Sequence, residues 1–549
     1  LVGCAGPGGP SAPEPAISRE PPPIEAGVAP PAGPYAPGFD VLHYDLALSL
    51  PDTGRAIRGR ARLRVARVAP VRDTLVLDLS GLAADTVRVG GDDVAFEHRA
   101  GKLRIPLPGG AGAGDTLSVE VAYHGQPDDG LILGRTAHGV GAAFADNWPD
   151  RARFWFPSID HPSDKATVAF TVEAPAEWQV VANGVEIGGP DGSARGARRT
   201  WRWATEVPIP TYTMVVGATR FAIGSVEVPG CAGGERGGAC VPVSFWVYPP
   251  DSARGAQAFA RAGEMMRFYS DLIAPFPYEK LAHVQSATRF GGMENASAIF
   301  YPERGVSAGA ELESTVAHET AHQWFGDAVT PAEWHELWLS EGFATYFGAL
   351  FFEHADGPAA FRRILAAERA HYLASPVVGR PVIDTAERSL FALLNANSYQ
   401  KGGLVLHMLR TLLGDEAFFE GVRRYYARHV HGTATTEALQ RVFEEVSGRE
   451  LGWFFEQWLR RPGYPVLRHT WRWDAASLEA EITIEQLQPA AWPTFRLPLV
   501  VEFALPSGVE RRVIEVDDRR EAVRVRLAAR PAAVRIDPDG DVLAVIRTE

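Results

Sequence analysis

The chain has 549 residues, which is enough for three or four domains and a large hydrophobic core. Hydrophobic residues make up 46% and charged residues 22% of it, a balance that is typical of globular proteins and not of disordered ones. The net charge of −13 argues against nucleic acid as a partner, and no apolar run is long enough to span a bilayer.

The first four residues, Leu-Val-Gly-Cys, resemble the lipobox that ends a bacterial lipoprotein signal peptide. Cys4 would then carry the lipid; the alternative is an apolar tetrapeptide without a role. Residues 5–37 are rich in Pro, Gly and Ala, so residues 1–37 predict a lipobox remnant followed by a semi-rigid tether. We therefore expect an extracytoplasmic protein, periplasmic or on the cell surface, that meets a bacterial membrane only through a lipid on Cys4. Because Ala5 rather than Asp follows the cysteine, the resemblance to lipoprotein sorting patterns points to an outer membrane.

Residues 38–245 predict an N-terminal β domain, because segments such as 45–50 and 74–79 alternate or run apolar between Gly and Pro turns. Cys231 and Cys240 bracket a Gly-rich loop between two expected strands, which favours a disulfide across the base of a hairpin. Zinc binding by this pair is the alternative, although no second pair of ligands lies nearby.

Residues 246–462 read as mainly helical, beginning with an amphipathic helix over 252–273. Within this region the stretch 316–327 reads V-A-H-E-T-A-H-Q-W-F-G-D. A helix there projects His318 and His322 from one face, where the two imidazoles can hold one zinc ion. Glu319 beside them can act on a water that the zinc activates. The alternative is an amphipathic helix with two surface histidines.

A third ligand favours the metal site over an ordinary helix. Eighteen residues separate His322 from Glu341, which lies in the segment W-L-S-E-G-F-A-T-Y, and this segment predicts a second helix. Three protein ligands with one open position are typical of a catalytic zinc site rather than a structural one.

H-E-x-x-H, eighteen residues and then Glu is the gluzincin pattern, and H-E-T-A-H-Q-W-F-G with L-W-L-S-E-G-F-A resembles the aminopeptidase N-like zinc metallopeptidases. The resemblance implies a multidomain α+β fold with a curved N-terminal β domain, a thermolysin-like, mainly α catalytic domain and a C-terminal β-sandwich. It also implies one Zn²⁺ held by His318, His322 and Glu341.

A further motif is similar to the family's G-x-M-E-N segment and consists of Gly291, Gly292, Met293, Glu294 and Asn295. In the family this segment is an edge strand that pairs with the substrate backbone, and its glutamate binds the free α-amino group. Ala296 and Ser297 follow, where relatives often have glycine at the second of these positions. The alternative is a Gly-Gly turn with a solvated glutamate.

Residues 398–404, S-Y-Q-K-G-G-L, are similar to the family's Y-x-K-G segment. The resemblance implies that Tyr399 stabilises the oxyanion together with zinc. The alternative is an aromatic packing residue at the start of a helix.

Residues 153–167, R-F-W-F-P-S-I-D-H-P-S-D-K-A-T, resemble the family's R-x-x-F-P-C-x-D-x-P-x-x-K-A signature. By this alignment Trp148 lies where many relatives carry a Gln or Glu that helps to hold the substrate's amino group. Asn147 or Asp146 would then take over the role of second anchor for the amino group. The alternative is that residues 147–150 are merely a turn.

Four other polar residues lie near these motifs. His407 sits among apolar residues and is interpreted as a core histidine. His335 and Glu336 are interpreted as outer or surface residues, since zinc already has three ligands. Thr345, one helical turn beyond Glu341, could hydrogen-bond behind the ligands.

Residues 463–549 return to strands, over 468–473, 478–484 and 497–503, whose spacing predicts a small β-sandwich. Longer relatives continue into a large helical domain, so we expect a short form with a more open cleft.

The combined motifs predict a zinc-dependent aminopeptidase that hydrolyses the N-terminal peptide bond of peptides with a free N-terminus, with Glu319 as the general base. A thermolysin-type zinc endopeptidase would need no Glu294. An epoxide hydrolase, as in the leukotriene-processing branch of the family, is a further alternative. A catalytically silent peptide-binding scaffold would be expected to have lost some of these residues.

Overall fold

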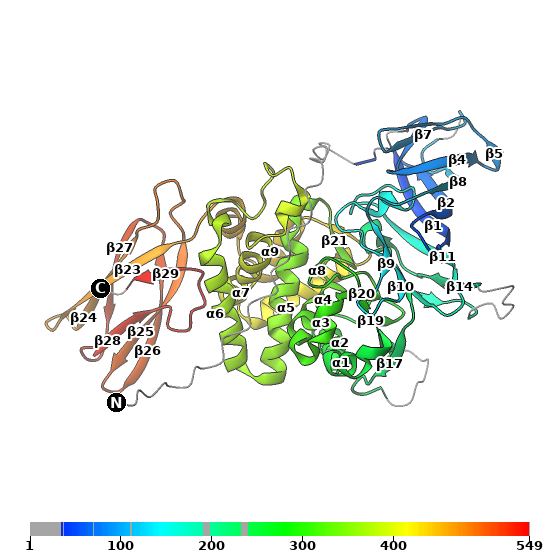
Figure 1. The fold of residues 1–549 in the computed structure, drawn as a ribbon. Coiled ribbons are helices and arrows are strands. Elements are labelled where there is room, and N and C mark those ends of the chain that lie inside the picture. The colour runs from blue at the N-terminus through cyan, green and yellow to red at the C-terminus, as the bar shows by residue number, and fades with distance from the viewer. Residues whose placement is uncertain are drawn as a thin grey trace, which may run out of the picture.

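The computed structural model describes residues 35–36, 38–69, 71–109, 112–189, 198–231 and 240–547. Cys4 lies outside the described residues, as does the predicted tether up to residue 34. A helical middle domain lies between a β-rich N-terminal domain and a β-rich C-terminal domain (Figure 1). The predicted multidomain α+β architecture is confirmed.

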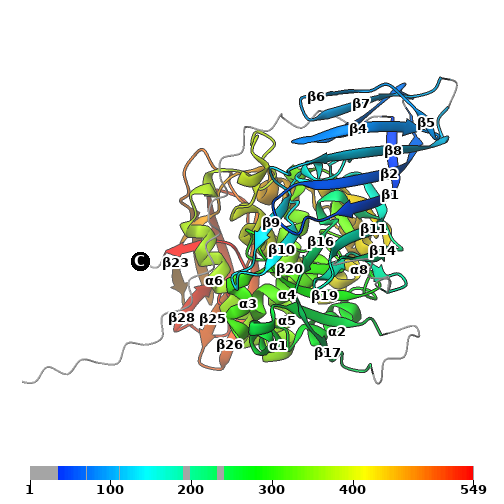
Figure 2. The same cartoon turned by 45° about the vertical axis from the view of Figure 1, so that its right-hand side comes forward.

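One large mixed sheet forms the body of the N-terminal domain, in the order β13-β14-β11-β1-β2-β8-β4-β5, with β15 beside β11. Figure 2 shows β1, β2, β8 and β4 side by side. Along β11 every second side chain is buried, because successive residues of a strand point to opposite faces. The strands are β1 (Phe39–Ser49), β2 (Ile57–Arg67), β4 (Leu82–Val89), β5 (Asp92–Asp93), β8 (Thr116–Gly125), β11 (Lys165–Pro175), β13 (Val185–Glu186), β14 (Arg198–Ala204) and β15 (Ile209–Pro210).

Two smaller sheets, β3-β7-β6 and β12-β16-β10-β9, complete this domain. Their strands are β3 (Thr74–Asp78), β6 (Glu97–Arg99), β7 (Lys102–Pro106), β9 (Leu131–Arg135), β10 (Gly141–Ala145), β12 (Gln179–Ala182) and β16 (Val216–Thr219). Tyr35 already packs on the domain, since its hydroxyl donates to Asp78 (2.8 Å) and its ring stacks on His161. Among the described residues, packing thus begins inside the predicted tether.

A separate sheet joins the N-terminal half of the chain to the helical domain. Its order is β17 (Ala222–Val226), β18 (Val243–Val247), β19 (Leu281–Ser286) and β20 (Ala298–Pro302). The boundary predicted between residues 245 and 246 therefore falls inside this sheet. The predicted disulfide between Cys231 and Cys240 is present between β17 and β18, with Cα atoms 5.6 Å apart.

The long helix α5 is the centre of the middle domain. It is apolar on most sides and largely buried, because α4, α6 and α7 pack around it. The helices are α1 (Ser252–Ala258), α2 (Ala262–Leu272), α3 (Glu303–Ser307), α4 (Glu313–His322), α5 (Trp338–Asp356), α6 (Pro358–Ala374), α7 (Gly402–Leu413), α8 (Asp415–His429), α9 (Thr436–Ser447) and α10 (Gly452–Phe455). A short strand pair, β21 (Val329–Pro331) and β22 (Gly432–Ala434), lies among them.

The single helix expected over 252–273 is wrong in one respect, because the chain forms α1 and α2 with a break between them. At the break Phe259 is fully buried and stacks on His283. The break between the helices therefore coincides with a residue whose ring is buried in the core.

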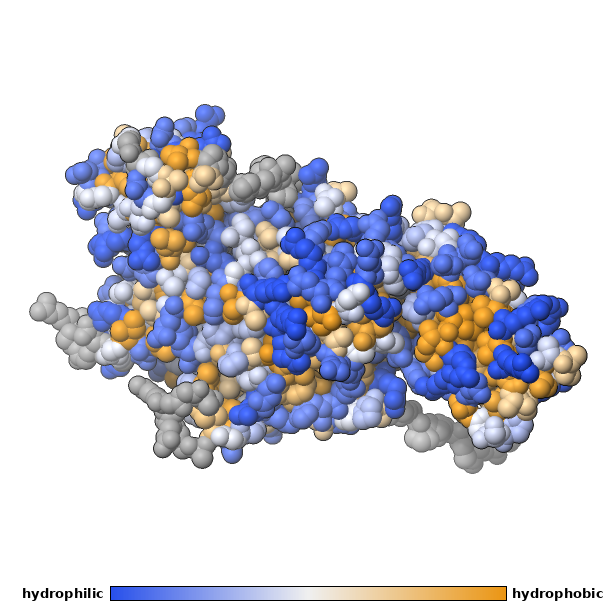
Figure 3. All heavy atoms as spheres, turned by 180° about the vertical axis from the view of Figure 1, so that it is seen from behind, coloured by the Kyte–Doolittle hydropathy of each residue, from blue (hydrophilic) through white to orange (hydrophobic). Residues whose placement is uncertain are grey.

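The C-terminal domain consists of the sheets β27-β24-β23-β29 and β26-β25-β28. The strands predicted over 468–473, 478–484 and 497–503 fall in β23, β24 and β25, and the predicted C-terminal β domain is confirmed. Its strands are β23 (Val466–Asp474), β24 (Glu479–Gln486), β25 (Leu497–Leu505), β26 (Gly508–Val516), β27 (Arg520–Arg526), β28 (Ala533–Ile536) and β29 (Val545–Arg547). Seen from behind, this domain carries an apolar area on its surface (Figure 3). No helix in the described part of the chain has the length and apolar character needed to cross a membrane.

Candidate active site

Three side chains from two adjacent helices form a triangle of ligand atoms. His318 and His322 lie on α4, and Glu341 lies in the first turn of α5. The two Nε2 atoms are 3.1 Å apart, and each is 3.2 Å from Oε2 of Glu341. A tetrahedral zinc ion with ligands at about 2.0–2.1 Å has ligand-to-ligand edges of roughly 3.3–3.4 Å. The triangle therefore has nearly the dimensions of one face of a zinc site.

Hydrogen bonds behind His322 fix its orientation. Its Nδ1 atom lies 3.1 Å from the carbonyl oxygen of Phe325 and 3.0 Å from Oγ of Ser340. A carbonyl oxygen only accepts, so Nδ1 carries a proton and Nε2 is the nitrogen that faces the triangle and could bind a metal ion. The helix ends at His322, and Gly326, at φ 120°, turns the chain back against this ring, where a Cβ atom would lie 3.0 Å from Nδ1.

Three carboxylates surround His322 in the protein interior. Glu294, Glu319 and Glu341 are 5%, 6% and 4% exposed. Burial raises the pKa of Glu319 well above its ordinary value, and Glu294 and Glu341 add to this although His322 opposes it. Burial would lower the pKa of His322, but Glu341 and Glu294 raise it to about 10. The cluster thus lacks positive charge, which a divalent cation would supply. Two nitrogens and one oxygen are donor atoms that suit zinc.

Glu341 differs from the other two carboxylates. Burial opposes its ionisation, yet His322 and hydrogen bonds from both imidazoles hold its pKa well below the usual range. It is therefore an anion under all ordinary conditions, as a metal ligand must be. The opposite shifts of Glu319 and Glu341 separate a basic carboxylate from a permanently charged one.

Tyr399 lies at the edge of the ligand triangle. Its hydroxyl donates to Oε1 of Glu341 (2.8 Å), and its ring is stacked on that of His318 with centroids 5.9 Å apart. It belongs to a π-helical turn, η8 (Asn397–Lys401), that leads into α7; such turns are frequent at functional sites. Lys401 holds the turn by donating to the carbonyl oxygen of Gly463 (3.2 Å).

The segment with Glu294 lies against the zinc helix. Met293 exchanges both backbone hydrogen bonds with Phe300, so the expected edge strand is reduced to one bridge among the described residues. The carboxylate of Glu319 lies over Gly292, where a Cβ atom would come within 2.2 Å of Oε1. Side-chain oxygens of Glu294 and Glu319 lie within 4.8 Å of each other and of a ring nitrogen of His322. Asn295 is fully buried, whereas a Cβ atom added to Gly291 would meet no described group within 4 Å.

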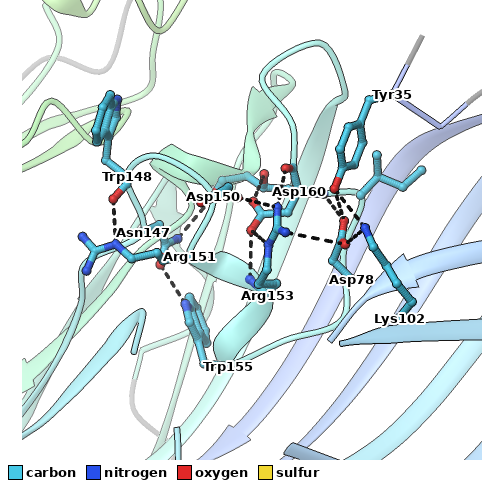
Figure 4. Close-up of polar contacts among 12 residues, drawn as sticks. Tyr35, Asp78, Lys102, Asn147, Trp148, Asp150, Arg151, Arg153, Trp155 and Asp160 are labelled. Atoms are coloured by element: carbon cyan, nitrogen blue, oxygen red, sulfur yellow. Dashed lines mark hydrogen bonds and ion pairs between the residues drawn. The ribbon is translucent and has the colours of Figure 1, made fainter. Parts of the chain in front are cut away.

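The predicted substitutes for a second amine anchor are already engaged. Asn147 donates to the carbonyl oxygens of Thr211 (3.1 Å) and Met214 (2.7 Å). It also accepts from the indole of Trp155 (2.8 Å), as Figure 4 shows. Asp146 accepts from Arg151 (3.1 Å) and from Thr288 (2.8 Å). Neither carries a free group for a substrate.

Trp148 is itself buried in an aromatic cluster. Its ring meets those of Phe290, Trp334 and Phe391 edge-on, with centroids 5.4–5.9 Å apart. Within the described part of the chain, its backbone oxygen accepts a hydrogen bond from Arg151 (2.7 Å) (Figure 4). Position 148 therefore carries a packed aromatic ring and no polar side chain that could bind an amino group.

The signature of residues 153–167 joins the N-terminal domain to the site. Arg153 lies between Asp150 (3.0 Å) and Asp160 (3.1 Å), as Figure 4 shows. Lys165 is half-buried and donates to the carbonyl oxygens of Asp327 (2.8 Å) and Ala328 (3.0 Å). This lysine therefore holds the chain that follows the zinc helix.

The four other polar residues that lie near the motifs in the sequence contact other parts of the protein. His407 is buried and lies 3.2 Å from Asp541, as expected of a core histidine. His335 donates to the carbonyl oxygen of Glu387 (3.0 Å), and Glu336 accepts from the backbone of Thr436 (2.7 Å), where it holds the start of α9. The side chain of Thr345 makes no hydrogen bond within the described part and instead lies over Gly403, where a Cβ atom would be 3.1 Å from its methyl group.

Three polar residues of the site were not predicted from the sequence. Ser340 and Gln323 directly precede or follow a ligand, and this adjacency was the available signal. Tyr212 donates to the carbonyl oxygen of Gly326 (3.1 Å) and lies beside Glu294. It comes from the N-terminal domain, and nothing in its local sequence marks it.

Comparisons with known proteins assign the N-terminal domain and the helical middle domain. The profile described as "Peptidase M1 N-terminal domain" matches residues 41–213, and "Peptidase family M1 domain" matches residues 257–458. Aminopeptidase N of Streptomyces lividans is 29% identical over 427 residues, which cover 72% of this chain and 46% of that relative. The chain spans about half the length of such curated relatives.

Two solved structures have a similar fold. The M1 zinc metallopeptidase from Deinococcus radiodurans matches with a TM-score of 0.68 and 28% identity, over 77% of this chain and 93% of that one. Aminopeptidase A of Legionella pneumophila matches with a TM-score of 0.80 over 94% of this chain and 60% of that one. At 20% identity, the second likeness concerns the fold alone.

Proposed function

The chain belongs to peptidase family M1, and we propose that it is a zinc-dependent aminopeptidase that removes the first residue of peptides. One observation carries the proposal: the buried carboxylate of Glu294 lies within 4.8 Å of Glu319 and His322. A carboxylate in this place accepts the α-ammonium group of a peptide. Because this carboxylate lies beside the proposed base and a zinc ligand, an ammonium group bound to it would place the end of a peptide chain at the metal site.

His318, His322 and Glu341 hold the zinc ion, for which their spacing and donor atoms are suited. When bound, zinc supplies a Lewis acid that polarises the scissile carbonyl and lowers the pKa of a water molecule. Ser340 and the carbonyl oxygen of Phe325 keep His322 in the tautomer that can bind it.

Glu319 is the general base. Its carboxylate takes a proton from the attacking water and passes it to the nitrogen of the leaving amine, so that the peptide bond breaks without a charged leaving group. A buried environment raises its pKa, which makes the carboxylate a stronger base than a solvated one.

Tyr399 stabilises the oxyanion. Its hydroxyl reaches Glu341 at the edge of the triangle, so a small rotation of the side chain directs the O–H group to a carbonyl oxygen that develops negative charge there. Burial raises the pKa of Tyr399 well above its ordinary value, and it remains a neutral donor.

The test uses two peptides that are identical except that one has an acetylated N-terminus. The wild-type protein should release the first residue of the free peptide only, and Glu294→Ala should abolish this while zinc remains bound. Internal cleavage of both peptides would replace the proposal with an endopeptidase. Cleavage of neither peptide by the zinc-loaded protein would favour a peptide-binding scaffold.

We propose further that the protein acts outside the cytoplasm, anchored through a lipid on Cys4, which lies outside the described residues. The disulfide between Cys231 and Cys240 supports an oxidising compartment. Mass spectrometry of the protein from bacterial membranes should find Cys4 acylated, and Cys4→Ser should release the protein. An unmodified Cys4 in wild-type protein would reject the anchor.

A further inference from the structure

Gln323 links the proposed amine anchor to the zinc helix. It directly follows His322 and is fully buried. Its side-chain nitrogen donates to the backbone oxygen of Glu294 (2.7 Å), and its side-chain oxygen accepts from the backbone nitrogen of Ser297 (2.8 Å). One amide group therefore holds the backbone at Glu294 and again three residues after it.

A third hydrogen bond keeps this amide in place. The same nitrogen donates to Oδ2 of Asp327 (2.8 Å), which lies in the chain just after the helix. With both N–H groups and the oxygen engaged, the amide has one orientation that satisfies all three partners. If the amide were rotated by 180°, its oxygen would face the acceptor oxygens of Glu294 and Asp327, and its N–H groups would face the backbone N–H of Ser297.

The other side of the segment is held by the N-terminal domain. Asn183 donates to the carbonyl oxygen of Ala296 (2.6 Å), and the backbone nitrogen of Gly184 donates to Oγ of Ser297 (2.9 Å). Lys280, which is not part of that domain and directly precedes β19, also donates to the backbone oxygen of Ser297 (3.2 Å). Ser297 has φ 63°, a left-handed conformation in which glycine is favoured, and these contacts hold it there.

We infer that Gln323 is a positioning residue that sets the distance between the metal ligands and the carboxylate of Glu294. His322 and Gln323 are consecutive on one rigid helix end, so a shift of the ligand moves the anchor with it. This inference rests on the proposed aminopeptidase function, because the distance matters only if Glu294 binds an α-ammonium group. Through Gln323, the spacing from amine to scissile bond is coupled to the metal site.

The test compares two zinc ligands that differ only in the amine: leucine hydroxamate and 4-methylpentanohydroxamate. Calorimetry on the zinc-loaded protein gives the dissociation constant of each probe. The ratio of the value for 4-methylpentanohydroxamate to the value for leucine hydroxamate measures amine recognition without turnover. In the wild type the amine-bearing probe should bind more tightly, and Glu294→Ala should reduce the ratio to about one. Gln323→Met keeps the length of the side chain and removes its hydrogen bonds, and it should reduce the ratio by about tenfold, as expected when buried partners lose their hydrogen bonds.

Gln285 provides a matched control. It is also fully buried, accepts from a backbone nitrogen, that of Tyr248 (2.8 Å), and donates to a carboxylate of Asp251 (2.8 Å) and to the carbonyl oxygen of Glu303 (3.2 Å). Gln285→Met should lower the melting temperature about as much as Gln323→Met. It should leave the ratio of dissociation constants unchanged.

The double variant Gln323→Met/Glu294→Ala separates positioning from general damage. If Gln323 acts through Glu294, the double variant has the ratio of Glu294→Ala alone. A wild-type ratio retained by Gln323→Met, or lowered equally by Gln285→Met, would overturn the inference and leave the proposed function standing. A wild type that binds both probes equally would overturn the proposed function and this inference with it.

Discussion

Two glycines set the position of Tyr399 relative to Glu341. Gly342 follows Glu341 on α5, and Gly402 begins α7 just after the turn that carries Tyr399. A Cβ atom on Gly342 would lie 2.8 Å from the carbonyl carbon of Gly402 and 2.9 Å from its Cα atom. The two backbones touch here, so no side chain can move aside to make room.

We predict that Gly342→Ala moves the turn with Tyr399 away from the metal ligands. Ordinary contact begins near 3.4 Å, so the backbone of Gly402 must retreat by about 0.6 Å. Overpacking of this kind costs about 1–3 kcal/mol, which outweighs or cancels the roughly 1 kcal/mol that alanine gains over glycine in a helix. The 2.8 Å contact of the Tyr399 hydroxyl would lengthen beyond good hydrogen-bond geometry, and kcat should fall at least about tenfold.

Gly348→Ala on the same helix is the matched control. A Cβ atom there would be 3.6 Å from the Cα atom of His318, which is ordinary contact. This variant should keep wild-type kcat and gain up to about 1 kcal/mol in the free energy of unfolding. Urea unfolding, kcat and zinc content of both variants test the prediction. If Gly342→Ala were as stable and active as Gly348→Ala, the close approach of α5 and α7 would not position Tyr399.

Three further predictions concern the charges and donors of the protein. Glu319→Gln should keep one zinc ion and lose about 10²–10⁴ in kcat; full activity would remove Glu319 from the reaction. Tyr399→Phe should lose about 10²–10³ in kcat with little change in KM, and an unchanged kcat would reject its role. Burial lowers the pKa of His283 to about 3, so below pH 6.5 the unfolded chain binds a proton that the folded chain does not. The free energy of unfolding should fall by up to about 1.4 kcal/mol per pH unit as pH decreases from 6.5 toward 3, and His283→Gln should lack this part of the slope in urea titrations.

The metal ligands could be predicted from the sequence because their information is local. His318 and His322 are four residues apart on a helix, and a single spacing to Glu341 completed the set. The structure brings all three ligand atoms to 3.1–3.2 Å of one another. The domain order also followed from local patterns, since strand and helix periodicities differ along the chain.

Residues that hold the ligands and the anchor could not be predicted in the same way. Asn183 and Tyr212 reach the site from the N-terminal domain, and their contacts depend on how two domains pack. Asp146 looked available in the sequence, yet Arg151 and Thr288 already use it. Whether a polar side chain is free is a property of its three-dimensional surroundings, which a single sequence does not specify.

The charge balance of the site gives an additional reason for selecting a free N-terminus. Glu294, Glu319 and Glu341 place three carboxyl groups around His322. When all three are ionised, as a zinc ion beside them would favour, the zinc ion compensates two of the charges and leaves one negative charge in a buried site. The α-ammonium group of a peptide neutralises it, whereas an acetylated peptide leaves it uncompensated where burial makes an unpaired charge costly. Selection for the amine would thus arise from the whole cluster, with Glu294 as the point of contact. The balance predicts that Glu294→Gln, which removes one charge and keeps the shape, lets the acetylated peptide bind about as well as the free one.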